Sequence, residues 1–410
     1  MDIIEIIAIL ITLSALFSYI NFRFLKLPKT IGLMFQSLAV SLLLILLNQI
    51  GLMSDFHARH LVQSIDFHKT LLHGMLGFLL FGGALRVDLN DLLDNEWEIA
   101  IFSTFGVIFS TLIVGSIIFV FLGKTLGALF CFLFGALISP TDPISVLSIL
   151  NNTDSPRRLK VQISGESLFN DGIGVVIFIS IFRLAFGNYE ANASEMVILF
   201  LKEALGGAAF GLGLGWIVYK ILQSVDNYRV EILITLALVF GGYTLAYDLG
   251  LSAPIAMVVA GLLIGNQGRR FAMSISTRRH LDDFWELIDD ILNAILFVLI
   301  GLEILNISLQ NFNIKAGLIA IPVVLFARFV TIIIPLIVLK FRSKFDPYAL
   351  KILTWGGLRG GISIALALSI PEGYEREIIV TMTYAVVAFS ILIQGFTIKR
   401  FIKRGKYTRQ

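Results

Sequence analysis

The sequence is poor in the residues that build metal centres and water-facing surfaces. Cys131 is its one cysteine among 410 residues, which excludes an intramolecular disulfide and a zinc site made of several thiolates. Charged residues make up 15% of the chain, whereas soluble domains carry about 25%. The net charge of +3 is small and the basic residues are spread along the chain, so no nucleic-acid partner is indicated.

Long apolar stretches are present where a soluble protein would have charged residues. Hydrophobic residues form 57% of the chain, and apolar stretches of about 20 residues, long enough to cross the ~30 Å hydrocarbon layer, recur throughout. We predict an all-α polytopic membrane protein with about thirteen transmembrane helices. The start, MDIIE, lacks the basic residues of a secretory signal, so the first span is expected to be retained. The expected spans are 3–21, 28–47, 67–86, 97–121, 125–150, 163–186, 195–221, 230–248, 252–267, 283–303, 314–339, 347–370 and 376–398.

The distribution of Lys and Arg predicts how these spans are oriented. When the N-terminus is placed outside, most basic residues between spans fall in the connections on the inside, and so does the basic tail. Such an excess on one side is the positive-inside pattern of membrane proteins. We therefore expect an external N-terminus and a cytoplasmic C-terminus.

Two of the expected spans are interrupted near their middle. Residues 139–143, SPTDP, place Asp142 between two prolines, each of which disrupts the helical hydrogen-bond ladder. Residues 356–361, GGLRGG, place Arg359 between two pairs of glycines. Lipid does not hydrogen-bond to unwound backbone, so such breaks are expected inside protein or beside a wet cavity. An acid at that depth is a functional-site hypothesis by itself.

The two broken spans occupy corresponding places in the two halves of the chain and run in opposite directions on the predicted topology. This layout predicts a secondary transporter with two inverted six-helix repeats and a site near the midplane. The expected divisions are one transporter unit over 1–410, a first repeat over 1–186 with core helices at about 67–186, a linker helix and loop over 187–229, and a second repeat over 230–410 with core helices at about 283–398.

A polar helix face begins the span that follows the first break. In residues 163–178, ISGESLFNDGIGVVIF, the polar side chains follow the spacing of three and four that places them on one side of a helix. They are Glu166, Ser167, Asn170 and Asp171. Together with Thr141 and Asp142 they offer oxygen ligands that suit a hard alkali cation. The alternative is a polar clamp between helices, the usual role of lone Ser, Thr and Asn residues in membranes.

Two arginines are expected inside the membrane and need partners. Arg328 lies midway along the eleventh span, where an unpaired cation is very unfavourable, and Glu166 is the best candidate partner. That pair is expected to hold helices together. Arg359 lies in the second break, where half-helix ends expose carbonyls and a negative dipole end that it is expected to neutralise. The positive end of the half-helix starting at Ile144 similarly favours Asp142.

Four motifs occur in order along nearly the whole chain: SPTDP, GESLFNDG, FWELIDDILNAILFVLIGLE (284–303) and GGLRGG. With these motifs the chain resembles the NhaP-type monovalent cation/proton antiporters, which are related to the animal sodium/proton exchangers. The resemblance implies an NhaA-like antiporter fold with unwound, crossed helices in a mobile core. It also implies a homodimer in the cytoplasmic membrane of a prokaryote, with no cofactor.

The resemblance also implies a role for individual residues. The ion-site acids correspond to Asp142 and Asp171. The neighbouring ligands correspond to Thr141, Ser167 and Asn170, and the core salt bridge to Glu166 with Arg328. Na+ is expected on Asp171, Asp142, Thr141 and Ser167. Some relatives add a glutamate from the third span, but residues 67–86 contain none.

The resulting prediction is a secondary antiporter that exchanges Na+ or Li+ for H+ by alternating access. Burial of Asp171 favours its protonated form, so a proton and a cation compete for one carboxylate. Asn170 cannot take a proton, and the resemblance implies that this form exchanges one for one without net charge movement. The alternatives are a K+/H+ antiporter and a cation channel. No enzyme activity is predicted, since the YD and GxGD patterns of intramembrane aspartyl proteases do not occur around either aspartate.

Some features keep two interpretations. Asp289 and Asp290, at the start of the apolar part of the tenth span, either line an access funnel or cap and solvate the helix. Four histidines form either a pH-sensing or metal-binding cluster or an ordinary surface group. They are His57, His60, His68 and His73.

The basic stretch 267–280 is expected to contact lipid headgroups. The glycines spaced by four residues in the seventh span, Gly207, Gly211 and Gly215, predict close helix packing.

Overall fold

The computed structural model describes residues 3–49, 74–151, 156–187, 193–306, 314–339 and 347–404. Every regular element in these ranges is a helix, so the predicted all-α class is confirmed. The α-helices are α1 (Ile3–Ile20), α2 (Lys29–Gln49), α5 (Leu76–Leu85), α6 (Leu89–Asp94), α7 (Glu96–Ala100), α8 (Gly106–Leu126), α9 (Ala128–Ile138), α10 (Ile144–Asn151), α11 (Arg157–Phe186), α12 (Ala193–Leu222), α13 (Tyr228–Asp248), α14 (Ala253–Leu263), α15 (Arg269–Phe271), α16 (Ile275–Leu302), α17 (Ile314–Leu339), α18 (Pro347–Trp355), α19 (Gly361–Leu368), α20 (Tyr374–Phe389) and α21 (Gly395–Arg404). Short π-helical or 3-10 turns are η1 (Asn21–Leu25), η3 (Ile101–Phe105), η4 (Ile264–Gly268), η5 (Glu303–Asn306) and η6 (Ser390–Gln394). The histidine cluster between residues 57 and 73 lies outside the described residues.

Both predicted interruptions of helices are present. Residues 139–143 are unwound between α9 and α10, and residues 356–360 are unwound between α18 and α19. The two unwound stretches are joined by one backbone bridge, in which the Asp142 N–H donates to the Leu358 carbonyl at 2.8 Å. The two broken spans therefore meet at their breaks.

Eight helices in the described ranges are long and apolar enough to cross a membrane. The other predicted spans are broken, short or charged. α5 and α9 are shorter apolar helices, α14 has 11 residues, and α16 carries charged side chains along its first half. The total of about thirteen spans and the inverted repeats stay predictions.

Polar residues at helix starts explain where three of the helices begin. Asn227 precedes α13, Ser252 precedes α14 and Ser274 precedes α16, and each side chain accepts a hydrogen bond from a backbone N–H in the first turn. Such N-caps satisfy donors that have no partner within the helix. Pro254, near the start of α14, reinforces that beginning, since proline is tolerated in the first helical turn.

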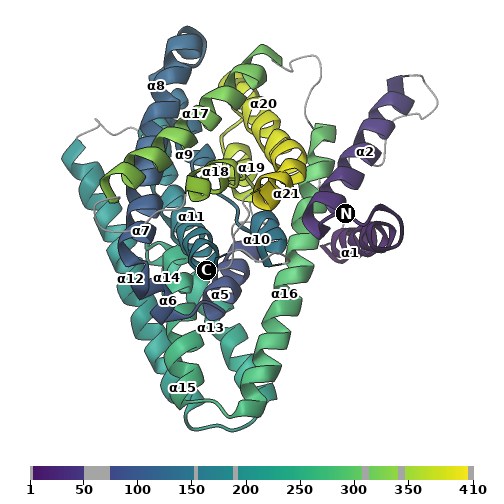
Figure 1. The fold of residues 1–410 in the computed structure, drawn as a ribbon. Coiled ribbons are helices and arrows are strands. Elements are labelled where there is room, and N and C mark those ends of the chain that lie inside the picture. The colour runs from purple at the N-terminus through teal and green to yellow at the C-terminus, as the bar shows by residue number, and fades with distance from the viewer. Residues whose placement is uncertain are drawn as a thin grey trace.

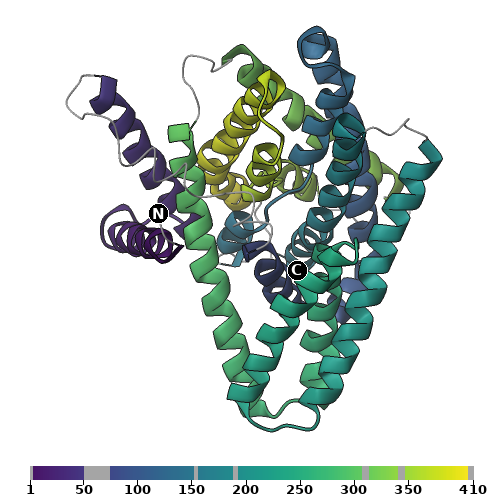
Figure 2. The ribbon, with the colours of Figure 1, turned by 180° about the vertical axis from the view of Figure 1, so that it is seen from behind.

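The helices form two packed groups (Figures 1 and 2). The first group, called the core bundle here, comprises α8 to α11 and α17 to α20, and both breaks lie within it. The second, called the scaffold, comprises α1, α2, α5, α12 to α14 and α16, with α12 packed on α14, α14 on α5 and α16 on α2. In both views α12 and α16 converge near α15, and the core bundle lies between them at the other end. The long helix α11 lies at the boundary, against α9 on one side and α12 and α14 on the other.

Large hydrophobic side chains are exposed along the long helices. Val120 of α8, Leu205 of α12 and Leu233 of α13 are all well over half exposed. Charged groups such as Glu166 and Arg328 are instead buried. An apolar exterior around polar groups suits lipid rather than water. The chain is an integral membrane protein, and the orientation of its termini stays a prediction.

Candidate cation site

The polar face of α11 contacts the unwound stretch between α9 and α10. Asn170 Nδ2 donates to Thr141 Oγ1 at 2.8 Å, and Asn170 Oδ1 accepts from the Thr141 N–H at 3.4 Å. Ser167 Oγ lies 3.2 Å from Thr141 Oγ1. All three side chains are buried. Asn170 thus supplies a partner for a backbone N–H that lies outside the regular helical ladder.

Asp142 caps α10 and is held in place by the second break. Its Oδ1 accepts from the Ile144 N–H at 2.9 Å, which puts a carboxylate at the positive end of α10 as the sequence predicts. On its other side, a Cβ added to Gly360 would lie only 2.8 Å from the Asp142 Cβ. Asp142 therefore occupies space that any larger residue at position 360 would take.

Arg359 reaches across to the other break. Its Nη1 donates to the Ser139 carbonyl and, at 2.9 Å, to the Pro140 carbonyl. The sequence predicted that Arg359 neutralises a half-helix end within its own break. The hydrogen bonds instead go to the end of α9, because the two breaks lie against each other. Arg359 is 1% exposed, so it compensates these carbonyls where water does not compete.

Glu166 and Arg328 form a bidentate ion pair. Arg328 Nη2 donates to Glu166 Oε2 at 3.0 Å, and Nη1 donates to Oε1. The Arg328 Nε also donates to the Leu353 carbonyl at 3.2 Å, near the end of α18. Both charged side chains are buried. The contact expected from the sequence is present and ties α11 to α17 and α18, which leaves the Glu166 carboxylate little capacity for another ligand.

A cavity of ≈ 540 Å³ opens beside the broken helix. Four of the predicted ion-site residues line it, namely Asp142, Asp171, Thr141 and Ser167. Asn170, the fifth, is not among the lining residues and is instead bonded to Thr141. Within the part of the chain that the structure describes, the partly buried Asp171 carboxylate has no hydrogen-bond or ion-pair partner. It is the free acid of the cavity.

The same cavity reaches three acids of α16, the third of which is Glu286. Asp289 and Asp290 line it, as an access funnel requires. Each also pairs with a cation of another scaffold segment: Asp289 with Arg86, directly after α5, and Asp290 with Lys29 at 2.8 Å. The Asp290 side chain is 60% exposed. The cavity therefore extends from Asp171 to charged groups in contact with solvent.

Sequence reasoning missed several polar groups that line the cavity, among them Arg86, Glu286 and two serines. Ser164 lies seven residues before Asp171 on the same helix face, so the spacing that selected the other polar residues could have found it. Ser363, at the start of α19, also lines the cavity. No local sequence signal predicts its place, because it comes to the site only through the meeting of the two breaks.

Oxygen atoms dominate the polar lining beside Asp171. Two carboxylates and the hydroxyls of Thr141, Ser164 and Ser167 face the cavity, and hard cations prefer such ligands over nitrogen or sulfur. Among the described residues no group of three or more His, Cys, Asp and Glu is placed to hold a metal ion. The arrangement can accommodate a proton or a small alkali cation at Asp171.

Three comparisons relate this arrangement to known proteins. Residues 11–404 match the family model described as sodium/hydrogen exchanger, transmembrane. The chain is 45% identical over 409 residues to the Na(+)/H(+) antiporter NhaP of Pseudomonas aeruginosa, covering 98% of this chain and 96% of that protein. It is 34% identical to the Na(+)/H(+) antiporter NhaH of Halobacillus dabanensis, over 93% of each chain. The solved sodium proton antiporter MjNhaP1 of Methanocaldococcus jannaschii has a similar fold, with a TM-score of 0.79 at 21% identity over 98% of this chain and 99% of that one.

Proposed function

Because the chain belongs to the transmembrane sodium/hydrogen exchanger family, we propose that it is a secondary antiporter that exchanges Na+ for H+ at Asp171. The observation that supports this site most strongly is the Asp171 carboxylate itself. It faces a cavity shared with Asp142 and Ser167, and it has no partner among the described residues. A carboxylate in that setting holds either a proton or a cation.

Competition between the two ions drives the exchange. Either a proton or a bound cation neutralises the Asp171 carboxylate, and each excludes the other. The ligands that we assign to Na+ are Asp171, Asp142, Thr141 and Ser167. Since a proton on Asp171 displaces Na+, lowering the pH raises the Na+ concentration that half-maximal exchange requires.

The moving part is the core bundle, and the scaffold stays in place. Each group packs extensively within itself. Contact between the groups is carried mainly by α11 against α12 and α14, with smaller contacts of α16 with α19 and of α2 with α10 and η6. Such a boundary allows one group to move as a rigid body. The sequence placed 67–86 and 283–303 among the core helices. We assign them to the scaffold because α5 packs on α14 and α16 packs on α2.

Exchange is one Na+ for one H+, and Li+ can replace Na+. Asn170 adds no titratable group, and both ends of its amide are bonded to Thr141, so Asp171 is the acid that alternates between the two ions. The names of the similar proteins favour Na+ over K+. Two helix breaks that meet beside buried charges support alternating access rather than an open channel.

The protein works as a homodimer in the cytoplasmic membrane of a prokaryote, with its N-terminus outside. The basic internal connections support this orientation. Substrates are monovalent cations and protons, and no cofactor takes part. Native mass spectrometry from detergent tests the dimer, and a mass of one chain would contradict it.

Proton flux in proteoliposomes tests the site. We expect Na+ or Li+ to trigger proton movement through the wild-type protein and Asp171→Asn to abolish it. Asp94→Asn is the matched control, because Asp94 is an exposed acid that does not line the cavity. Undiminished exchange in Asp171→Asn would remove Asp171 from the mechanism, and flux triggered only by K+ would favour the K+/H+ alternative.

A further inference from the structure

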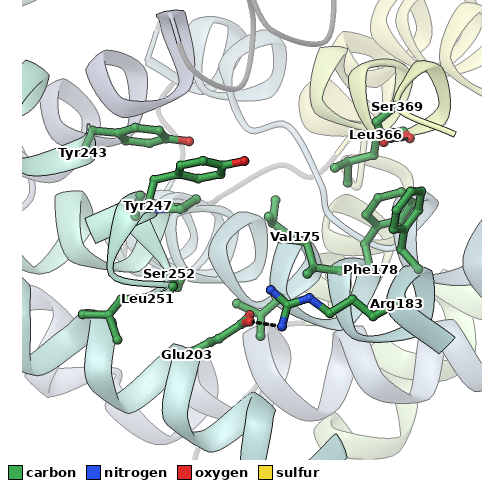
Figure 3. Close-up of a pocket in the computed structure, with 16 residues that line it drawn as sticks. Val175, Phe178, Arg183, Glu203, Tyr243, Tyr247, Leu251, Ser252, Leu366 and Ser369 are labelled. Atoms are coloured by element: carbon green, nitrogen blue, oxygen red, sulfur yellow. Dashed lines mark hydrogen bonds and ion pairs between the residues drawn. The ribbon is translucent and has the colours of Figure 1, made fainter. Parts of the chain in front are cut away.

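A second cavity, of ≈ 490 Å³, lies further along α11 (Figure 3). Its walls come from both groups of helices: Phe178 and Leu366 belong to the core bundle, and Tyr243 and Tyr247 belong to the scaffold. On the predicted orientation α11 runs outward from the cytoplasm. The second cavity therefore lies on the external side of the ion site.

A tight helix contact separates the two cavities. Asp171 is the last residue of α11 that lines the first cavity, and Val175 is the first that lines the second. Between them, Gly172 packs against α14 so closely that a Cβ added to it would lie 2.8 Å from Ile255 Cγ1. The two cavities are therefore separate, and this contact lies between them on α11.

One ion pair crosses the boundary between the core bundle and the scaffold within the second cavity. Arg183 Nη1, on α11, lies 2.9 Å from Glu203 Oε1, on α12, and Figure 3 shows the two side chains meeting at the cavity wall. The Glu203 side chain is 6% exposed and the Arg183 side chain 48%. The acid is thus held inside protein, while the cation reaches in from the cavity edge.

Each partner of this pair is fixed to its own group of helices. The Glu203 carbonyl accepts from the Ser252 N–H at 3.0 Å, and a Cβ added to Gly207 would lie 2.6 Å from the Ser252 carbonyl oxygen. These contacts hold α12 against α14. Arg183 lies on the same continuous helix as Asp171, about 18 Å further along its axis. Movement of α11 away from α12 must therefore separate Arg183 from Glu203.

We propose that the Arg183–Glu203 pair is a latch, which holds the core bundle against the scaffold on the outer side while the side with Asp289 and Asp290 is open, and which breaks once in each transport cycle. The inference rests on the alternating access proposed above and adds to it the contact that holds one state. Loss of either charge shifts the population toward the outward-open state.

Thiol labelling from the outside tests the latch. In a Cys131→Ala background, Ser369→Cys places a reactive group in the wall of the second cavity. We expect Glu203→Gln or Arg183→Gln to raise its labelling rate by a membrane-impermeant maleimide about fivefold, as for a partly exposed ion pair. Restoration of slow labelling by the charge-reversed pair, Arg183→Glu with Glu203→Arg, would show that the pairing itself matters.

Asp91→Asn is the matched control, because it breaks an ion pair with Arg157 at the opposite end of the same helix. We expect it to leave labelling at position 369 unchanged. Equal labelling in wild type and Glu203→Gln, or an equal increase in Asp91→Asn, would overturn the latch.

A cross-link distinguishes failure of the latch from failure of the proposed antiport. With cysteines at positions 183 and 203 the charges of the latch are lost, so we expect fast external labelling at position 369 before cross-linking. Joining the two cysteines with a bifunctional thiol reagent is expected to stop exchange and to make that labelling slow. Unimpaired exchange in the cross-linked protein would overturn the latch and leave the antiporter intact. Absence of exchange before cross-linking, with labelling that still responds to Glu203→Gln, would count against the antiporter and leave the latch in place.

Discussion

At the scale of single residues, the partner of each acid decides what the acid can do. Glu166 is bound on both oxygens by Arg328, so it holds helices together. Breaking such a buried pair on one side costs about 3–5 kcal/mol, because the remaining charge stays buried without a partner. Asp171 differs, since no cation among the described residues neutralises it. On the proposed mechanism, an ion from outside the protein takes that role.

The close approach of Gly360 to Asp142 gives a test at this scale. A methyl group in Gly360→Ala would lie 2.9 Å from Asp142 Oδ2 and would displace the carboxylate from the cavity. We expect the Na+ concentration for half-maximal exchange to rise about tenfold, equivalent to about 1.4 kcal/mol of lost binding. Gly241→Ala is the control, since nothing lies within 4 Å of an added Cβ there. An unchanged Na+ dependence in Gly360→Ala would contradict the role given to Asp142.

At the scale of elements, close packing of α12 on α14 keeps the scaffold rigid. The glycines predicted to form a packing ridge do contact α14: a Cβ on Gly211 would lie 2.4 Å from the Ala256 carbonyl oxygen, and one on Gly215 would lie 3.2 Å from the Ala260 Cα. Without side chains at these positions the two backbones approach closely, as small residues allow in membranes. A rigid scaffold gives the core bundle a surface to move against.

Two alanine substitutions on α12 separate this packing from helix propensity. Gly211→Ala forces the helices apart, and we expect it to lower the free energy of unfolding by about 1–3 kcal/mol. Gly213→Ala meets nothing within 4 Å and restricts the unfolded chain, so we expect it to be neutral or to stabilise by about 0.4–1 kcal/mol. Thermal unfolding in detergent measures both. Equal midpoints for the two variants would argue against tight packing at position 211.

The breaks show which parts of the site a sequence reveals. The interruption at 139–143 could be predicted because proline acts locally, and the contact of Glu166 with Arg328 because a buried charge needs an opposite one. The polar side chains that face the cavity could be predicted only in part. Asn170 and Asp171 are neighbours on a helix, so their side chains point about 100° apart. Which of them faces the cavity depends on how α11 is rotated against the break.

The carbonyls that Arg359 contacts could not be predicted from the residues around it, for a different reason. Its need for carbonyl partners follows from the glycine-rich break around it, and the sequence predicts that need. The carbonyls that it contacts belong to Ser139 and Pro140, which are distant in the chain. Only the three-dimensional meeting of the two broken spans selects them.

At the scale of the whole molecule, the charge balance of the moving bundle sets its response to the membrane potential. The buried cation Arg328 is neutralised by Glu166, and Arg359 faces the carbonyl end of α9. The charge at Asp171 is then cancelled by a proton in one direction of movement and by Na+ in the other. A charge that crossed the field would cost about 2.3 kcal/mol per 100 mV, and the proposed one-for-one exchange moves none.

Electroneutral exchange is therefore expected in proteoliposomes. The rate of Na+-driven proton movement should be the same whether the membrane potential is clamped at zero or at a negative value with K+ and valinomycin. Asp171→Asn liposomes give the background leak under both clamps. A rate that changes severalfold with potential after this correction would show that charge moves in each cycle.

The hydrogen bonds from Arg359 to the end of α9 also set an order of events during biosynthesis. The Arg359 side chain and the Pro140 carbonyl that it caps are 219 residues apart in sequence. At a synthesis rate of about 5–20 residues per second, roughly 10–45 s pass between the two. The Asp142 N–H lacks its acceptor, the Leu358 carbonyl, for about the same time. The first half of the protein therefore enters the membrane before the partners of its break are made. The ribosome must nearly finish the chain before the proposed ion site can form.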